Sequence, residues 1–129
     1  MLKTYLDDVQ AVVNTFAEAP FVVQSTFDID LRPGHQAYLT GRFYFVDGSV
    51  LHFREYVDAT GPTIEKVSYT YHYQDEEHQL IFRYDNAHHR PPLAFKEHKH
   101  TPDIIIQAKA PSLEAVLLEI VELRQFDHS

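Results

Sequence analysis

Residues 36–58 read QAYLTGRFYFVDGSVLHFREYVD and contain the clearest indication of the fold. Residues 36–46 and 50–58 are rich in aromatic and β-branched side chains, and the dipeptide Asp47-Gly48 stands between them. Strand-forming runs that flank Asp-Gly are the strongest short-range signal for a β-hairpin. The stretch therefore predicts two antiparallel strands joined by a two-residue turn.

The run before this hairpin alternates in the same way. Over residues 21–29, one face of the expected strand carries Val23, Ser25, Phe27 and Ile29. An alternation with period two is typical of a strand with one buried face. The turn signal Arg32-Pro33-Gly34 separates this strand from the hairpin.

Further strand-like runs follow the hairpin. Residues 64–74 and 79–84 are two more expected strands, and residues 104–106, three consecutive isoleucines, could add a short sixth. Consecutive strands joined by short turns favour an antiparallel meander. The sequence thus predicts a sheet of five or six strands.

Amphipathic helices are expected at both ends of the chain. Apolar residues recur at helical spacing over residues 2–16, and Pro20 ends that pattern. A second apolar stripe begins after Pro111-Ser112, with Ser112 as the expected N-cap. The predicted fold is therefore α+β, a meander sheet with both helices packed on one face, in a single domain of residues 1–129.

Composition limits the possible functions. Apolar residues make up 44% of the chain and there is no cysteine, so disulfides, thiolate metal sites and thiol catalysis are excluded. No apolar run approaches the roughly 18 residues of a membrane span. Asp7 and Asp8 stand where a signal peptide would be apolar, so we expect a cytoplasmic protein. The net charge of −8 disfavours nonspecific binding to nucleic acid.

The densest group of titratable residues lies in residues 80–100, LIFRYDNAHHRPPLAFKEHKH. Four of the nine histidines fall between His88 and His100. From Arg83 to His100 the four basic and two acidic side chains give a net charge of +2, on a chain of charge −8. Such density on a loop beside a strand is typical of a catalytic or binding site.

The alternation of side chains along the expected strands indicates partners for this segment. Glu55 shares a strand face with Leu51, Phe53 and Val57, and a lone buried carboxylate is costly. Arg83, which shares a face with Asp85 on the next but one strand, is the candidate cationic partner. The alternative is that Glu55 and Arg83 form a purely structural pair.

Four segments resemble the TumE family, small toxins of bacterial and archaeal toxin–antitoxin pairs. They are FREYVD at residues 53–58, SYTYHYQD at 68–75, LIFRYDNAHH at 80–89 and EHKH at 97–100. The resemblance covers about the last two-thirds of the chain. It implies a toxin encoded beside an antitoxin that carries a DNA-binding helix-turn-helix.

The chemistry of the segment fits a metal-independent endoribonuclease, which needs a base, an acid and cations for the developing charge. The candidate catalytic residues are His89, His98, His100, Arg83, Asp85 and Glu55, the two carboxylates orienting a histidine or acting as base. The candidate substrate-binding residues are Arg90, Lys99, Asn86 and Tyr84. RNA is a possible partner, and no cofactor is expected.

Two alternatives stay open. His98 and His100 on an extended segment would face the same side, and His88 could complete a zinc site, although the spacing matches no established zinc signature. The loop could instead dock an antitoxin or another protein without catalysis, and a homodimer is possible. Four isolated histidines are interpreted as solvated, and Tyr69, Tyr71 and Tyr73 as one packed sheet face. Those histidines are His35, His52, His72 and His128.

Overall fold

The computed structural model describes residues 1–87 and 95–126. The hairpin around Asp47-Gly48 forms as expected from β2 (Gln36–Phe45) and β3 (Val50–Asp58). Its turn is longer than predicted, because four residues lie between the strands. The carbonyl of Phe45 accepts from the amide of Gly48 at 3.0 Å, and Gly48 adopts φ 85°, which glycine tolerates without steric cost.

The sheet has seven strands in sequence order, every neighbouring pair antiparallel. The α+β meander is therefore confirmed, with one strand more than the upper estimate. The strand missed by sequence analysis is the short β6. The remaining elements are α1 (Leu2–Ala17), β1 (Val22–Arg32), β4 (Glu65–Gln74), β5 (Leu80–Asp85), β6 (His98–His100), β7 (Ile105–Gln107) and α2 (Leu113–Arg124).

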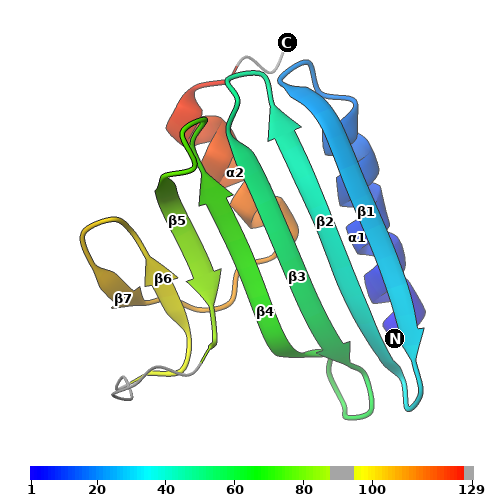
Figure 1. Ribbon diagram of the computed structural model, residues 1–129. Coiled ribbons are helices and arrows are strands. Elements are labelled where there is room, and N and C mark those ends of the chain that lie inside the picture. Colours follow the sequence, from blue (N-terminus) through cyan, green and yellow to red (C-terminus); the bar gives the residue numbers. More distant parts are fainter. Residues whose placement is uncertain (88–94, 127–129) are drawn as a thin grey trace.

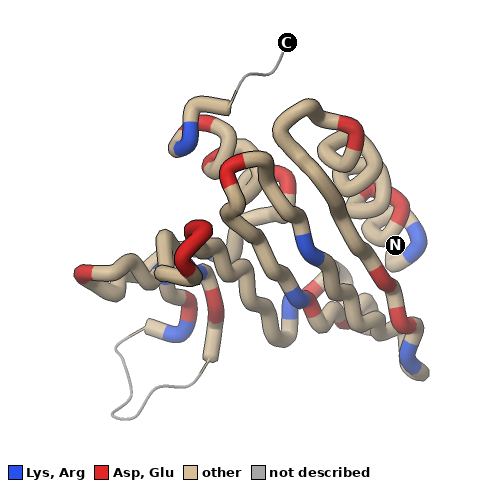
Figure 2. The backbone as a smooth tube through the Cα atoms, turned by 45° about the horizontal axis from the view of Figure 1, so that its top comes forward, with Lys and Arg blue, Asp and Glu red and all other residues tan. Residues whose placement is uncertain are grey.

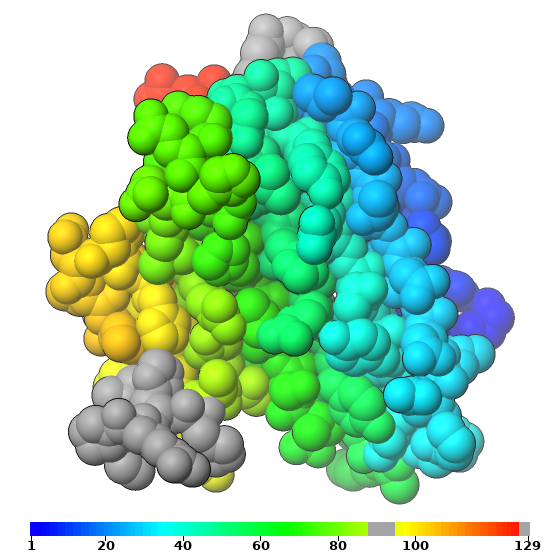
Figure 3. All heavy atoms as spheres, in the orientation of Figure 1, coloured from blue at the N-terminus to red at the C-terminus, as the bar shows by residue number. Residues whose placement is uncertain are grey.

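Both helices lie on one face of the sheet, as predicted (Figure 1). Alternate residues of the central strands are fully buried against them, including Leu39, Phe53, Tyr71 and Phe82. The predicted packed tyrosine face is confirmed, since Tyr69, Tyr71 and Tyr73 are all buried. We call the opposite side of the sheet the open face, and no helix of the described residues lies over it (Figure 3).

In the first strand, the predicted side of the sheet is wrong for one residue. A β-bulge between Val22 and Gln24 shifts the register, so Val23 is 69% exposed instead of sharing a face with Phe27. An extra residue in one strand reverses the alternation on its far side. Beyond the bulge, Ser25, Phe27 and Ile29 share the helix-covered side as expected.

The helix signals are confirmed. Ser112 caps α2, because its Oγ accepts from the amide of Ala115 at 3.0 Å. α1 ends at Ala17, three residues before Pro20. No helix in the described ranges is long and apolar enough to cross a membrane.

Candidate functional site

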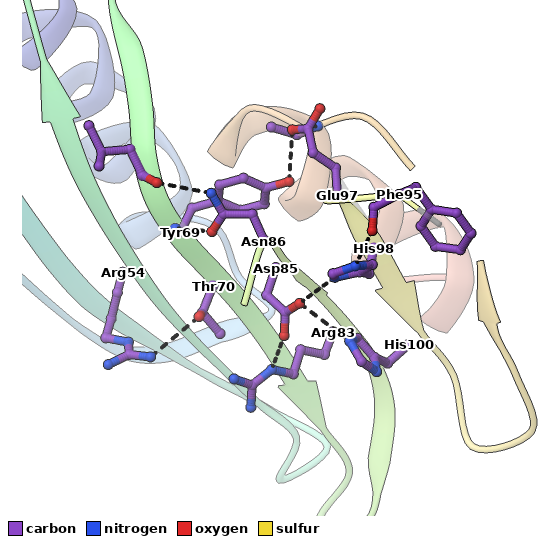
Figure 4. Close-up of polar contacts among 12 residues, drawn as sticks. Arg54, Tyr69, Thr70, Arg83, Asp85, Asn86, Phe95, Glu97, His98 and His100 are labelled. Carbon is purple, nitrogen blue, oxygen red and sulfur yellow. Dashed lines mark hydrogen bonds and ion pairs between the residues drawn. The ribbon is translucent and has the colours of Figure 1, made fainter. Parts of the chain in front are cut away.

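The carboxylate of Asp85, at the end of β5, is the centre of a polar cluster (Figure 4). Its Oδ2 accepts from Nε of Arg83 at 2.8 Å. Its Oδ1 lies 3.2 Å from Nδ1 of His98 and 3.3 Å from Nε2 of His100. We call these four residues the Asp85 cluster.

The pairing of β5 with β6 assembles the cluster. Asp85 lies opposite His98 and Arg83 lies opposite His100 in the antiparallel register. Because alternate side chains of a strand point to the same side, both histidines face the open side with Arg83 and Asp85. Lys99, between the histidines, points to the helix-covered side.

The cluster stabilises the ionised form of Asp85, which is only 3% exposed. Burial alone would raise the pKa of this carboxyl, but the hydrogen bonds from Arg83 and His98 and the charge of His100 outweigh it. The pKa of Asp85 is therefore lower than usual. A buried carboxylate with three cationic or titratable donors is a fixed negative charge within the cluster.

The two histidines differ in access. The side chain of His98 is 2% exposed, and its Nε2 lies 2.7 Å from the carbonyl of Phe95. Each of its ring nitrogens thus faces an acceptor. The side chain of His100 is 16% exposed. His100 is the histidine of this pair that a molecule on the open face reaches more readily.

The structure brings together four of the predicted catalytic residues, the members of the Asp85 cluster, and gives the described substrate-binding candidates other partners. Tyr84 and Lys99 both bond Glu119 of α2, at 2.6 Å and 2.7 Å, on the helix-covered side. Asn86 bridges backbone groups, accepting from the amide of Tyr69 and donating to the carbonyl of Val67. The predictions for His88, His89, Arg90 and His128 lie outside the described residues.

Glu55 is fully buried, as its position predicts, but its expected partner is wrong. Its carboxylate accepts from the hydroxyls of Tyr5 and Tyr71 and lies 3.5 Å from Nζ of Lys66. Arg83 bonds Asp85 on the other side of the sheet instead. Glu55 therefore belongs to the packing between the sheet and the helices, and it lies outside the Asp85 cluster.

The sequence pattern did not indicate a set of polar residues that the structure places on the open face. Arg42 lies opposite His52, and His52 lies opposite His72, so two histidines interpreted as isolated are cross-strand neighbours. Arg54 lies two residues beyond His52 on the same strand. The two-residue turn predicted at Asp47-Gly48 would have aligned Arg42 with Phe53, and the longer turn of the structure shifts that register by one residue, so that Arg42 lies opposite His52.

The Asp85 cluster also has the donor set of a metal site. One ligand atom from each of Asp85, His98 and His100 lies within 4.8 Å of the others. The Asp85 Oδ1 distances to the histidine nitrogens, 3.2 Å and 3.3 Å, match the separation of about 3.3 Å between ligand atoms around a tetrahedral zinc ion. The carbonyl of Phe95 would hold the second nitrogen of His98, as an outer-shell acceptor does.

Comparison with known proteins gives one match. A family model described as "Toxin TumE" matches residues 12–125, which is most of the chain. No curated protein and no solved structure matches.

Proposed function

The chain belongs to the TumE toxin family, and from this membership we propose that it acts as the toxin of a toxin–antitoxin pair by cleaving RNA at the Asp85 cluster. The observation that supports this activity is the convergence of Arg83, His98 and His100 on one buried carboxylate. A base, a cation and a group that orients the base are thereby held at one point of the open face.

His100 acts as the base in this proposal. Its Nε2 donates to Asp85, which fixes the tautomer and the orientation of the ring. The 2′-hydroxyl oxygen of the RNA attacks the adjacent phosphorus, and its proton passes to His100. The bond from phosphorus to the 5′ oxygen breaks, and that oxygen takes a proton from water. The products are a 2′,3′-cyclic phosphate and a 5′-hydroxyl end.

Arg83 and His98 have different roles. The Arg83 side chain is 36% exposed, so its guanidinium is within reach of a phosphate on the open face while it bonds Asp85. A guanidinium at this point stabilises the extra negative charge on the attacked phosphate. His98 is enclosed between Asp85 and Phe95, so it acts as a positioning residue that holds the carboxylate in place.

A cleavage assay on labelled mixed-sequence RNA tests the proposal. We expect His100→Ala to lower the rate at least about 100-fold, the usual contribution of a general base. His35→Asn is a matched control, because His35 lies in an exposed turn with φ 60°, which asparagine tolerates. The new ends should accept phosphate from polynucleotide kinase without prior dephosphorylation, as 5′-hydroxyl ends do. Full activity of His100→Ala would refute the assignment of the base.

A divalent cation held by Asp85, His98 and His100 is the second candidate, favoured by the spacing of their ligand atoms. Such an ion would activate water, and water attack would leave a 5′-phosphate instead of a 5′-hydroxyl. A chelator therefore separates the two mechanisms. Activity that a chelator removes and zinc restores, with 5′-phosphate ends, would favour the metal; activity that persists would favour His100 as base.

Family membership implies an antitoxin partner. We propose that this partner carries a DNA-binding helix-turn-helix and suppresses the toxin. Expression of the chain alone should arrest growth, and co-expression of the neighbouring gene should relieve the arrest. Arrest that persists in His100→Ala would show that toxicity does not depend on the proposed cleavage.

A further inference from the structure

A row of basic and imidazole side chains crosses the open face from β2 to β6. Each member lies opposite the next in the strand register, and we call the set the open-face row. Its members are Arg42, His52, His72, Arg83 and His100. Because neighbouring strands stand about 4.8 Å apart, Arg42 and Arg83 are about 14 Å from each other across the sheet.

Arg54 adds a further cation beside this row. It is exposed on β3, and its Nη2 donates to Oγ1 of Thr70 at 3.3 Å. In the part of the chain that the structure describes, no carboxylate lies within ion-pair distance of Arg42 or Arg54. These two guanidinium charges are therefore not neutralised by a neighbour among the described residues.

The histidines between the arginines are sensitive to this local charge. Burial lowers the pKa of His52, and the charges of Arg42 and Arg54 lower it further. Burial and the charge of Arg83 lower the pKa of His72 in the same way. The centre of the open face is therefore locally positive, although the whole chain carries −8.

Most of the acidic positions lie elsewhere. Figure 2 shows them along α1, along β1 and in the turns between strands. Asp28 and Asp30 make the β1 edge of the sheet negatively charged. An anionic ligand is therefore attracted only to the part of the face between β2 and β6. This part of the face leads to Arg83 and the Asp85 cluster.

Two shallow hollows lie along the same path. One, of about 440 Å³, is lined by residues of β1, β2 and β3, including Arg42 and His52. The other, of about 300 Å³, includes Tyr56, Arg83 and Asn86. The two hollows share Tyr38 and Arg54, and the rings of Tyr38 and Tyr56 stand 6.4 Å apart. Both hollows are thus lined by aromatic rings and guanidinium groups.

We propose that the open face binds a single-stranded segment of RNA, whose phosphates contact Arg42 and Arg54 and whose bases stack on Tyr38 and Tyr56. This inference rests on the proposed function, since it supplies the RNA to the Asp85 cluster through Arg83, which belongs to both. The proposed substrate class is unpaired RNA.

The combination of groups favours an unpaired strand over other anions. Base stacking on aromatic side chains needs bases that are not already stacked in a helix. A duplex would offer the arginines its phosphates but would leave the tyrosines without a partner. An acidic peptide would satisfy the arginines but has no flat rings to match the hollows.

Binding of a fluorescein-labelled RNA of about 12 nucleotides, within the usual site sizes, tests the inference. Fluorescence anisotropy is measured with 2′-O-methyl RNA in the presence of a chelator, so that the RNA stays intact whichever residue is the base. Arg42→Gln and Arg54→Gln should each weaken binding about tenfold and lower the salt dependence by about 0.7 in log–log slope. Tyr38→Leu should also weaken binding about tenfold but leave the slope unchanged, because it removes stacking and no charge.

Lys3→Gln is the matched control for loss of a positive charge, since Lys3 is exposed on α1 and α1 covers the other side of the sheet. It should bind RNA as the parent does. The inference fails if the parent does not bind, if duplex RNA of the same length binds equally well, or if Arg42→Gln with Arg54→Gln binds normally. It also fails if an acidic peptide displaces the RNA at equal concentration and loses affinity in the same variants.

The same experiments distinguish failure of the RNA-binding inference from failure of the proposed function. Loss of cleavage in His100→Ala together with normal binding by the arginine variants would retain the catalytic proposal and remove the binding face. Weakened binding in the arginine variants together with full cleavage by His100→Ala would do the reverse. Circular dichroism of each variant confirms that the fold is retained.

Discussion

The hydroxyl of Tyr71 on β4 donates to the buried carboxylate of Glu55 on β3 at 2.5 Å. Tyr5 of α1 donates to the same carboxylate. Lys66 lies 3.5 Å from it and donates to the carbonyl of Pro111, two residues before α2. Glu55 therefore links the first helix, the sheet and the segment that leads into the second helix.

Removal of this carboxylate should destabilise the protein strongly. We expect Glu55→Ala to lower the free energy of unfolding by about 3–5 kcal/mol, because it leaves the buried amine of Lys66 without its counter-ion. Glu55→Gln retains an acceptor oxygen and should cost about 1–3 kcal/mol. Urea denaturation measures both. The double variant Glu55→Leu with Lys66→Met should recover most of the loss, and equal loss in single and double variants would contradict the pairing.

Buried tyrosines should make the fold sensitive to alkali. Burial raises the pKa of Tyr5, Tyr69 and Tyr71, with the neighbouring carboxylates of Glu55 or Glu97 adding to the effect. A raised folded-state pKa gives stability that is complete below the unfolded value of about 10 and is lost as the pH rises above it. The chain has eight tyrosines and no tryptophan, so tyrosinate absorbance reports the ionisation of all eight, and the buried ones contribute the part that appears at higher pH.

We expect the absorbance of these three tyrosines to appear together with the loss of the circular dichroism signal. Tyr5→Phe should lower the amplitude of that coupled phase by one tyrosine. Full tyrosinate absorbance near pH about 10 with an intact dichroism signal would contradict their burial in the folded state.

Gly41 lies where the sheet leaves no room for a side chain. A Cβ there would lie 2.5 Å from the Phe53 ring and 2.8 Å from the carbonyl of Thr26. Gly41→Ala should therefore cost about 1–3 kcal/mol through overpacking. Gly61→Ala is the matched control, since a Cβ there has nothing within 4 Å, and it should stay within about 0.5 kcal/mol. Equal effects of the two substitutions on the urea midpoint would contradict the tight contact.

The sequence determined the central strands well because their pattern is local. The bounds of β3 and the Ser112 cap follow from alternation and capping chemistry alone. β6 could not be predicted in this way, since the polar tripeptide His98-Lys99-His100 has no strand signature of its own. It is a strand because its backbone pairs with β5 and β7 and its histidines bond Asp85.

The site was predicted in part for a related reason. The alternation of side chains within one strand correctly placed Arg83 and Asp85 on the same face of β5. This alternation alone cannot show whether residues of two separated strands lie on the same side of the sheet. That requires the register of every strand between them. Tyr71 lies opposite both Phe53 and Tyr84, so the face of Glu55 continues into Tyr84 and not into Arg83. The pairing of Glu55 with Arg83 was wrong for this reason.

The carboxylate of Asp85 should contribute to the free energy of unfolding in a way that depends on pH. Asp85→Asn keeps the size of the side chain but places an amide donor opposite the donors of Arg83 and the two histidines. We expect a loss of about 1–3 kcal/mol at about pH 7, measured by urea denaturation. Asp28→Asn, at an exposed carboxylate on β1, is the matched control and should change stability by less than about 0.5 kcal/mol.

The pH dependence of that loss distinguishes a charged contact from a steric one. The pKa of Asp85 is lower in the folded state than the unfolded value of about 3.9, despite the opposing effect of burial. Its contribution to stability is thus complete above that unfolded value and is lost as the pH falls through the folded pKa. The difference between the parent and Asp85→Asn should therefore shrink between about pH 5 and about pH 2. A difference that stays constant over this range would show that the charge of Asp85 does not stabilise the cluster.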